Sequence, residues 1–253
     1  MDTLISNEIR KKIIQLSFSS KSAHLGSCLS SVEILISVFK FCKKNRIEVI
    51  FSKGHAAMAY YATLAVFGFI KNFSYKHYLK KGSKFWAHIS KYKNNFLKFS
   101  FGSLGYGLGI SAGLALGYRN IKKKRTIFCI LSDGELNEGS VWESLMFISH
   151  HKLNNVIIII DYNKFQSFGK LEEVIDLKSY KNKFQSFNFD FQSVDGHNLK
   201  EIESAIIKRT DKPKVIMCNT IKGKGIKRIE NKLSSHYHPA ELLDLNIFSR
   251  EII

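Results

Sequence analysis

Three clusters of polar residues follow apolar stretches of the chain: Ser132-Asp133-Gly134-Glu135, Asp161-Tyr162-Asn163 and Asp195-Gly196-His197. Asp133 offers a carboxylate oxygen and Asn163 an amide oxygen, and Mg²⁺ takes such ligands together with the phosphate oxygens of a substrate or cofactor. Gly134 has no side chain, so its backbone amide can come close to a phosphate. An Asp-Gly pair alone is common in turns. Followed by an Asn after the next apolar run, it predicts a site for Mg²⁺ and a phosphate.

The elements that must position these residues are short apolar strands alternating with helices. Strands are expected at residues 47–51, 126–131, 156–161, 215–219 and in a segment ending at Val194. Helices are expected at residues 2–20, 32–42, 56–69, 140–152 and 199–208, with Ser30 or Ser31 as cap of the second. Residues 71–101 are expected to be irregular. This order predicts an α/β fold, one domain over residues 1–253 with a parallel sheet and helices on both faces. Ligands of such sheets bind at the carboxyl ends of the strands.

Glycines recur between Gly102 and Gly117, with small residues and leucines between them. Each glycine inside a helix costs about 1 kcal/mol relative to alanine. Their repetition therefore indicates a close approach of the backbone, both to a packed element and to a ligand.

The composition narrows the classes of partner. The chain has 253 residues, 45% of them hydrophobic, and a formal charge of +18. This charge favours anionic partners, although a general bias toward lysine explains it equally well. The basic residues are scattered and no nucleic-acid-binding motif occurs, so we expect no nucleic-acid partner.

Four cysteines, the N-terminus and the apolar runs bear on location. Cys28, Cys42, Cys129 and Cys218 lie too far apart for a C-x-x-C zinc motif, and Cys129 is expected to be a small buried apolar residue. The N-terminus lacks the order of a signal peptide, and the longest aliphatic run is too short to span a bilayer. We expect a cytoplasmic protein without a membrane partner.

Six segments in the same order resemble the transketolase family. They are HLGSCLSSVEIL from His24, FSKGHAAMAYYATLAVFGF from Phe51, GSLGYGLGISAGLALG from Gly102, the stretch from Asp133 to Gln166, VDGHN from Val194 and IKGKG from Ile221. The stretch from Ser132 to Asn163 resembles the motif by which this family binds thiamine diphosphate. The resemblance covers nearly the whole chain.

The resemblance implies thiamine diphosphate and Mg²⁺ as cofactors, with Ca²⁺ or Mn²⁺ as substitutes for the metal. It assigns the metal to Asp133, Asn163 and the backbone carbonyl of Phe165. The cofactor-binding residues it implies are Ser103, Leu104, Gly105, Asp133, Gly134, Glu135 and Asn163. Glu135 is alternatively a cap for the helix that begins near residue 138.

Four histidines match family histidines around the thiazolium ring and the substrate hydroxyls, and are the implied catalytic residues: His24, His55, His88 and His236. His238 is an alternative to His236, because the sequence around them departs from the family pattern. Glu138 matches a family glutamate near a subunit interface.

The implied activity is transfer of a two-carbon ketol unit from a ketose donor to an aldose acceptor, both of them sugars that are expected to be phosphorylated. The glutamate that activates the cofactor belongs to a pyrimidine-binding domain that has no counterpart in this sequence. We therefore expect the partner to be a C-terminal transketolase-like subunit, in a heterotetramer with two copies of each chain.

Two departures from the family pattern leave alternatives open. Ser132 replaces a glycine, which a negative φ would allow, and Trp86-Ala87-His88-Ile89 replaces the usual residues around the donor histidine. One alternative is a 1-deoxyxylulose 5-phosphate synthase-like or 2-oxo acid dehydrogenase E1-like subunit. Another is a regulatory paralogue without catalytic activity.

Overall fold

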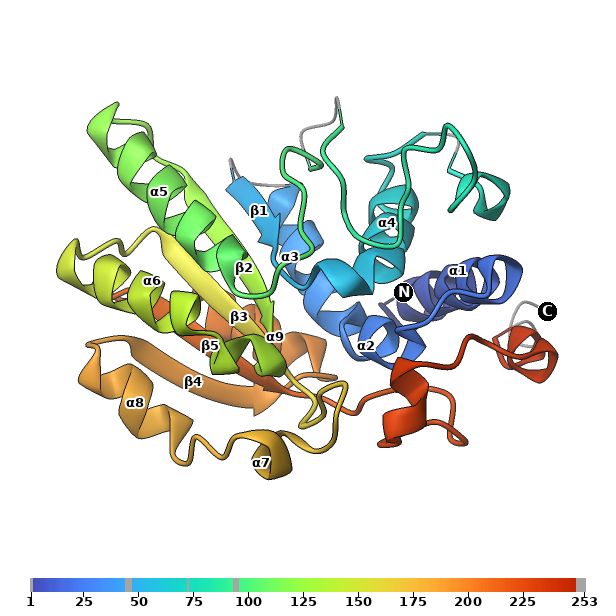
Figure 1. Ribbon diagram of the computed structural model, residues 1–253. Helices are drawn as coiled ribbons and strands as arrows, with labels where there is room; N and C mark the ends of the chain where they lie inside the picture. The colour runs from blue at the N-terminus through green and yellow to red at the C-terminus, as the bar shows by residue number, and fades with distance from the viewer. Residues whose placement is uncertain (1, 44–46, 72, 93–95, 249–253) are drawn as a thin grey trace.

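A sheet of five parallel strands forms the centre of the protein (Figure 1). The computed structural model describes residues 2–43, 47–71, 73–92 and 96–248. The strands are β1 (Ile47–Phe51), β2 (Thr126–Ser132), β3 (Val156–Tyr162), β4 (Asp190–Asp195) and β5 (Lys214–Asn219), in the spatial order β1-β2-β3-β5-β4. The predicted parallel sheet is confirmed, and every predicted strand is present.

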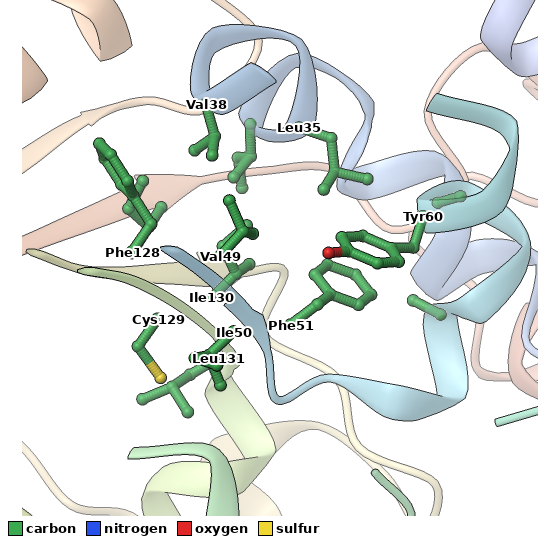
Figure 2. Packing of buried hydrophobic residues seen from close by; sticks show 14 of the residues in the cluster. Leu35, Val38, Val49, Ile50, Phe51, Tyr60, Phe128, Cys129, Ile130 and Leu131 are labelled. Carbon is green, nitrogen blue, oxygen red and sulfur yellow. The ribbon is translucent and has the colours of Figure 1, made fainter. Parts of the chain in front are cut away.

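The strands of the sheet centre are apolar on both faces, because helices cover both. In β3 the run from Val156 to Ile160 is buried throughout, as expected for a central parallel strand. Figure 2 shows the alternation: Val49 and Ile130 point toward Leu35 and Val38 of α3, while Cys129 points to the opposite side. Cys129 is fully buried, as predicted.

The helices lie on the two faces of the sheet, as predicted (Figure 1). On one face α5 (Tyr106–Asn120) packs on β1, β2 and β3, with α6 (Gly139–His150) beside it. On the other face α9 (Leu199–Ile207) packs on β4 and β5 and against α3 (Val32–Cys42). Next to them α1 (Asp2–Ser20) packs on α4 (Ala57–Val66).

Several short elements were not predicted. They are α2 (Leu25–Ser30), α7 (Leu171–Val174), α8 (Tyr180–Ser186) and the 3₁₀ turns η1 (Gly54–Ala56), η2 (Tyr75–His77), η3 (Asp133–Asn137), η4 (Leu233–His236) and η5 (Leu242–Asn246). The helix predicted over 56–69 ends at Val66, and Gly68 follows with φ 78°. The predicted cap of α3 is wrong: Ser30 and Ser31 donate their hydroxyl hydrogens to Asp161 instead.

The segment predicted to be irregular, 71–101, contains only η2 in its described part, and residues 72 and 93–95 of it lie outside the described residues. Aromatic packing holds this segment on α4: the Tyr61 ring lies 5.1 Å from that of Phe85, between ring centroids. The Tyr60 hydroxyl donates to the carbonyl of Phe96 at 2.9 Å. The segment is thereby fixed where it carries His88.

None of the described helices is both long enough and apolar enough to cross a bilayer.

The first prediction concerns the sheet core. Ile158 is fully buried in β3, opposite Cys129 of β2 and Val215 of β5. Ile158→Ala should lower the free energy of unfolding by about 3 kcal/mol, because it removes buried methyl groups and leaves a cavity. Ile207→Ala is the matched control, since Ile207 is 66% exposed and should change stability by less than about 0.5 kcal/mol. Urea unfolding measures both, and equal effects would contradict this account of the core.

Candidate active site at the carboxyl ends of the strands

A cavity of about 210 Å³ opens at the carboxyl ends of β2 and β3. It brings together nearly all the residues singled out from the sequence: His24, His55, His88, Leu104, Asp133, Gly134, Asn163, Phe165 and His236. Its described lining also includes Ser27, Gly102, Ser132, Gln166 and Ser167, but not Ser103, Gly105 or Glu135. Segments more than 200 residues apart therefore meet at one place.

The two expected metal ligands lie on neighbouring strand ends. Ser132 and Asp161 are paired in the β2–β3 register, so Asp133 and Asn163 follow side by side. Both are almost completely buried. The Asp133 carboxylate accepts hydrogen bonds from the backbone amides of Gly134 at 2.9 Å and Lys164 at 2.5 Å. The Asn163 amide oxygen accepts one from Phe165 at 3.1 Å.

Asp133 is held in an electrostatically unfavourable place. Burial, followed by the charge of Asp161, raises its pKa to about 7. The Lys164 amide, Lys53 and Lys222 only partly offset this. A divalent cation beside Asp133 would stabilise its ionised form, and the oxygen-rich surroundings suit Mg²⁺. The residues present therefore fit the expected metal.

Lys222 is a site residue that the sequence reasoning missed. It is fully buried in the loop after β5, and its ammonium group has no hydrogen-bond partner among the described residues. Burial lowers its pKa to about 8, although the charge of Asp133 opposes this shift. A buried ammonium group without a partner is costly, so Lys222 fits an anionic ligand. Its place in the segment IKGKG was the only signal in the sequence.

Asp161, in contrast, is fully paired. It is completely buried and forms an ion pair with the equally buried Lys53. It also accepts hydrogen bonds from Ser30 at 2.6 Å, from Ser31 at 3.0 Å and from Thr220. These donors and the charge of Lys53 lower the pKa of Asp161 although burial alone would raise it. Asp161 thus joins the strand ends and is not free for a ligand.

Glu135 connects the glycine-rich loop to the strand ends. Its buried carboxylate accepts hydrogen bonds from the backbone amides of Gly105 at 3.0 Å and Ser132 at 2.8 Å, and from the Ser52 hydroxyl. With Ser132 it forms a capping box on η3. This position matches the alternative of a cap, although the element is η3 and not the helix near residue 138.

Gly105 is required by both its conformation and its neighbours. Its φ is 85°, and a Cβ atom there would lie 2.5 Å from the Ser140 hydroxyl and 2.9 Å from the Cβ atom of Glu138. Gly107 lies against Ser52 in the same way. The predicted close approach is therefore present at the start of α5. Around Gly113 and Gly117 there is open space among the described residues.

The four histidines surround the cavity. The His24 ring lies 4.7 Å from that of His236, 5.5 Å from His55 and 6.1 Å from His88, between centroids. His24 has a left-handed backbone, φ 67°, and its amide donates to the His236 carbonyl at 2.8 Å. His238 is exposed and does not line the cavity, whereas His236 does.

Three of these imidazoles are neutral at pH 7. Burial lowers the pKa of His24 to about 4, helped by the charges of His88 and Lys222. Burial and the charge of Lys222 lower the pKa of His236 to about 4 as well. His55 is more deeply buried, and its pKa lies well below the usual value. A neutral imidazole can both donate and accept a hydrogen bond, as recognition of a hydroxyl requires.

Two further features of the lining differ from or add to the expectations. Ser132 has φ −86°, so it takes the place of a glycine without strain, as predicted. Gln166 was not singled out, yet it lines the cavity and its buried side-chain amide nitrogen has no hydrogen-bond partner in the described structure. Nothing in the sequence pattern around Gln166 marked it.

Comparison with known proteins gives the family. Residues 1–249 match the family described as "Transketolase, thiamine diphosphate binding domain". The chain is 34% identical over 243 residues to the 6-deoxy-6-sulfo-D-fructose transketolase subunit SqwG of Clostridium sp. (strain MSTE9), covering 91% of this chain and 88% of that one. It is 34% identical to a subunit of the apulose-4-phosphate transketolase of Actinobacillus succinogenes, covering 90% and 87%. It is 32% identical to human transketolase, covering 92% of this chain but 39% of that protein.

Solved structures show the same fold. Transketolase from Leishmania mexicana superposes with a TM-score of 0.89 at 19% identity, over 98% of this chain and 40% of that chain. Transketolase from Campylobacter jejuni gives 0.82 at 25% identity, over 96% and 42%. From the match of sequence, fold and site, the chain belongs to the transketolase family and carries its thiamine diphosphate-binding domain.

Proposed function

We propose that this chain is the diphosphate-binding subunit of a split transketolase that depends on thiamine diphosphate and Mg²⁺. It would transfer a two-carbon ketol unit from a ketose donor to an aldose acceptor. The observation that carries the proposal is the single cavity in which Asp133 and Asn163 lie beneath a ring of neutral histidines. One end of this cavity suits a metal-bound phosphate, and the other suits sugar hydroxyls.

The diphosphate and the metal would be held from below. Asp133, Asn163 and the Phe165 carbonyl would ligate Mg²⁺, and the Gly134 amide and Lys222 would bind phosphate oxygens. Ser103, Leu104 and Gly105 would contribute backbone contacts from the loop before α5, with Gly105 held by Glu135. When bound, thiamine diphosphate supplies a nucleophilic carbon that attacks a ketose carbonyl.

The histidines would act on the sugar. His24, His55 and His236 are neutral, so each can accept a proton from a substrate hydroxyl or donate a hydrogen bond to it. His88 lies on the irregular segment at the rim of the cavity and is exposed. It would contact the donor end of the sugar.

A partner chain would complete the catalyst. Two relatives of similar length are named as transketolase subunits, and this chain covers 88% and 87% of them. The partner would carry the pyrimidine-binding domain and its activating glutamate. The exposed Glu138, which adjoins Gly105, would lie at this interface, and the assembly would be a heterotetramer.

The sugars are expected to carry an anionic group. The same two relatives are named for a sulfo-sugar and a sugar phosphate, and this chain has a formal charge of +18. A basic surface increases the encounter rate with anionic substrates.

The first prediction of this proposal concerns the metal. Asp133→Ala should abolish Mg²⁺-dependent binding of thiamine diphosphate, because it removes the only carboxylate assigned to the metal. Isothermal titration calorimetry with and without Mg²⁺ measures this. Asp211→Ala, in an exposed loop, is the control and should bind like the wild type. Unchanged affinity in Asp133→Ala would refute the metal assignment.

The second concerns Lys222. Lys222→Met should weaken thiamine diphosphate binding about 10- to 100-fold, since hydrogen bonds to charged groups contribute about 1.5–3 kcal/mol. Binding of thiamine, which has no phosphate, should not change. Lys227→Met alters an exposed lysine of the same loop and should leave both affinities unchanged. An equal loss for both ligands would show that Lys222 does not contact the phosphates.

The third concerns the partner. With thiamine diphosphate and Mg²⁺ the purified chain alone should show no transfer from ketoses, and adding a chain with the pyrimidine-binding domain should restore it. Product formation from a ketose and from pyruvate, compared in the assembled enzyme, separates a transketolase from the pyruvate-using alternatives. Turnover of ketoses at ordinary enzymatic rates by this chain alone would refute the split enzyme.

A further inference from the structure

His197 follows β4 and lies outside the cavity, yet it contacts the segment that carries Lys222. Its Nε2 atom accepts a hydrogen bond from the backbone amide of Ile221 at 2.8 Å. Because Nε2 accepts, the ring proton must be on Nδ1, which lies 3.0 Å from a carboxylate oxygen of Glu33. Both ring nitrogens are therefore used, and the tautomer is defined by its two partners.

Glu33 is in turn fixed by Arg10. The Arg10 guanidinium makes two parallel hydrogen bonds to the Glu33 carboxylate, at 2.7 and 2.9 Å, and both side chains are buried. Although burial raises it, the hydrogen bond from His197 and the charge of Arg10 bring the pKa of Glu33 to about 2. Glu33 thus stays ionised and holds the Nδ1 proton of His197.

The same network grips the loop a second time. Arg10 Nε donates to the carbonyl of Lys224 at 3.2 Å. His197 and Arg10 therefore hold the residues on either side of Lys222 and Gly223, using side chains from α1, α3 and the loop after β4.

Lys222 depends on this support because its own ammonium group makes no hydrogen bond within the described protein. The direction of its side chain is set by the loop backbone, whose other contacts are Gly223 N to Gly26 O at 3.0 Å and Asn231 N to Lys222 O at 2.9 Å. A shift of the Ile221 peptide would move the Lys222 side chain away from its place beside Asp133.

We propose that His197 is a positioning residue for the diphosphate site: by accepting the Ile221 amide hydrogen, it holds Lys222 where a phosphate can be bound. This inference rests on the proposed function of Lys222. It adds to that function a residue that does not touch the cavity, and it gives the Arg10–Glu33 pair a role in ligand binding.

Two substitutions separate the contacts of His197. His197→Gln places an amide oxygen near the position of Nε2 and can still accept the Ile221 hydrogen. His197→Asn is shorter: it can donate to Glu33 in the manner of Nδ1 but cannot reach Ile221. In titration calorimetry of the full chain with thiamine diphosphate and Mg²⁺, Asn should weaken binding about tenfold, as expected for one lost hydrogen bond to a buried amide. Gln should restore most of the affinity, and His77→Asn, an exposed histidine, should bind like the wild type.

A double-mutant cycle with Lys222→Met tests whether the effect passes through Lys222. In the Lys222→Met background, His197→Asn should cause less than a twofold further loss. A full tenfold loss in that background, or equal losses for Asn and Gln, would overturn the proposal and indicate only general destabilisation.

A measurement on the wild type does not depend on the folding of any variant. Hydrogen exchange followed by NMR should show a slowly exchanging Ile221 amide, and rapid exchange would overturn the proposal. The two hypotheses fail separately. If Lys222→Met binds thiamine diphosphate as tightly as the wild type, the proposed role of Lys222 fails. If Lys222→Met weakens binding and His197→Asn does not, only the role of His197 fails.

Discussion

The site depends on one buried ion pair, Lys53 with Asp161. Both side chains are completely shielded from water, so each charge is stable only while the other is in place. Lys53 also donates to the Ser27 carbonyl and the Ser31 hydroxyl, both at 2.9 Å. With the Thr220 hydroxyl on Asp161, the pair joins the ends of β1, β3 and β5 to α2. Removing either charge would leave the other unpaired at the floor of the cavity.

This pairing decides which neighbouring charges remain available. Asp161 spends its charge on Lys53 and on three hydroxyl groups, yet its presence still raises the pKa of Asp133. Lys53 in turn lowers the pKa of Lys222. The saturated inner pair is thus surrounded by an acid and a base that both lack a strong partner within the protein. A metal diphosphate supplies the cation for one and the anion for the other.

Much of this arrangement could be predicted from the sequence, because it follows from local patterns. Apolar runs predicted each strand, and polar residues at their ends predicted Asp133 and Asn163 as neighbours. The roles of Ser30, Ser31 and Lys53 could not be predicted, since Ser30 and Asp161 lie 131 residues apart in sequence and no periodicity links them. Lys222 was missed for a similar reason: among the many lysines of this chain, only its burial without a partner distinguishes it.

The left-handed backbone of His24 shows how stability and activity oppose each other in this protein. A residue other than glycine in this conformation costs on the order of 1 kcal/mol, and glycine would adopt φ 67° without that cost. Glycine would also remove the imidazole at the centre of the histidine ring. A selection for thermal tolerance alone would therefore favour loss of this side chain, so directed evolution of this scaffold should leave position 24 unchanged and seek stability elsewhere.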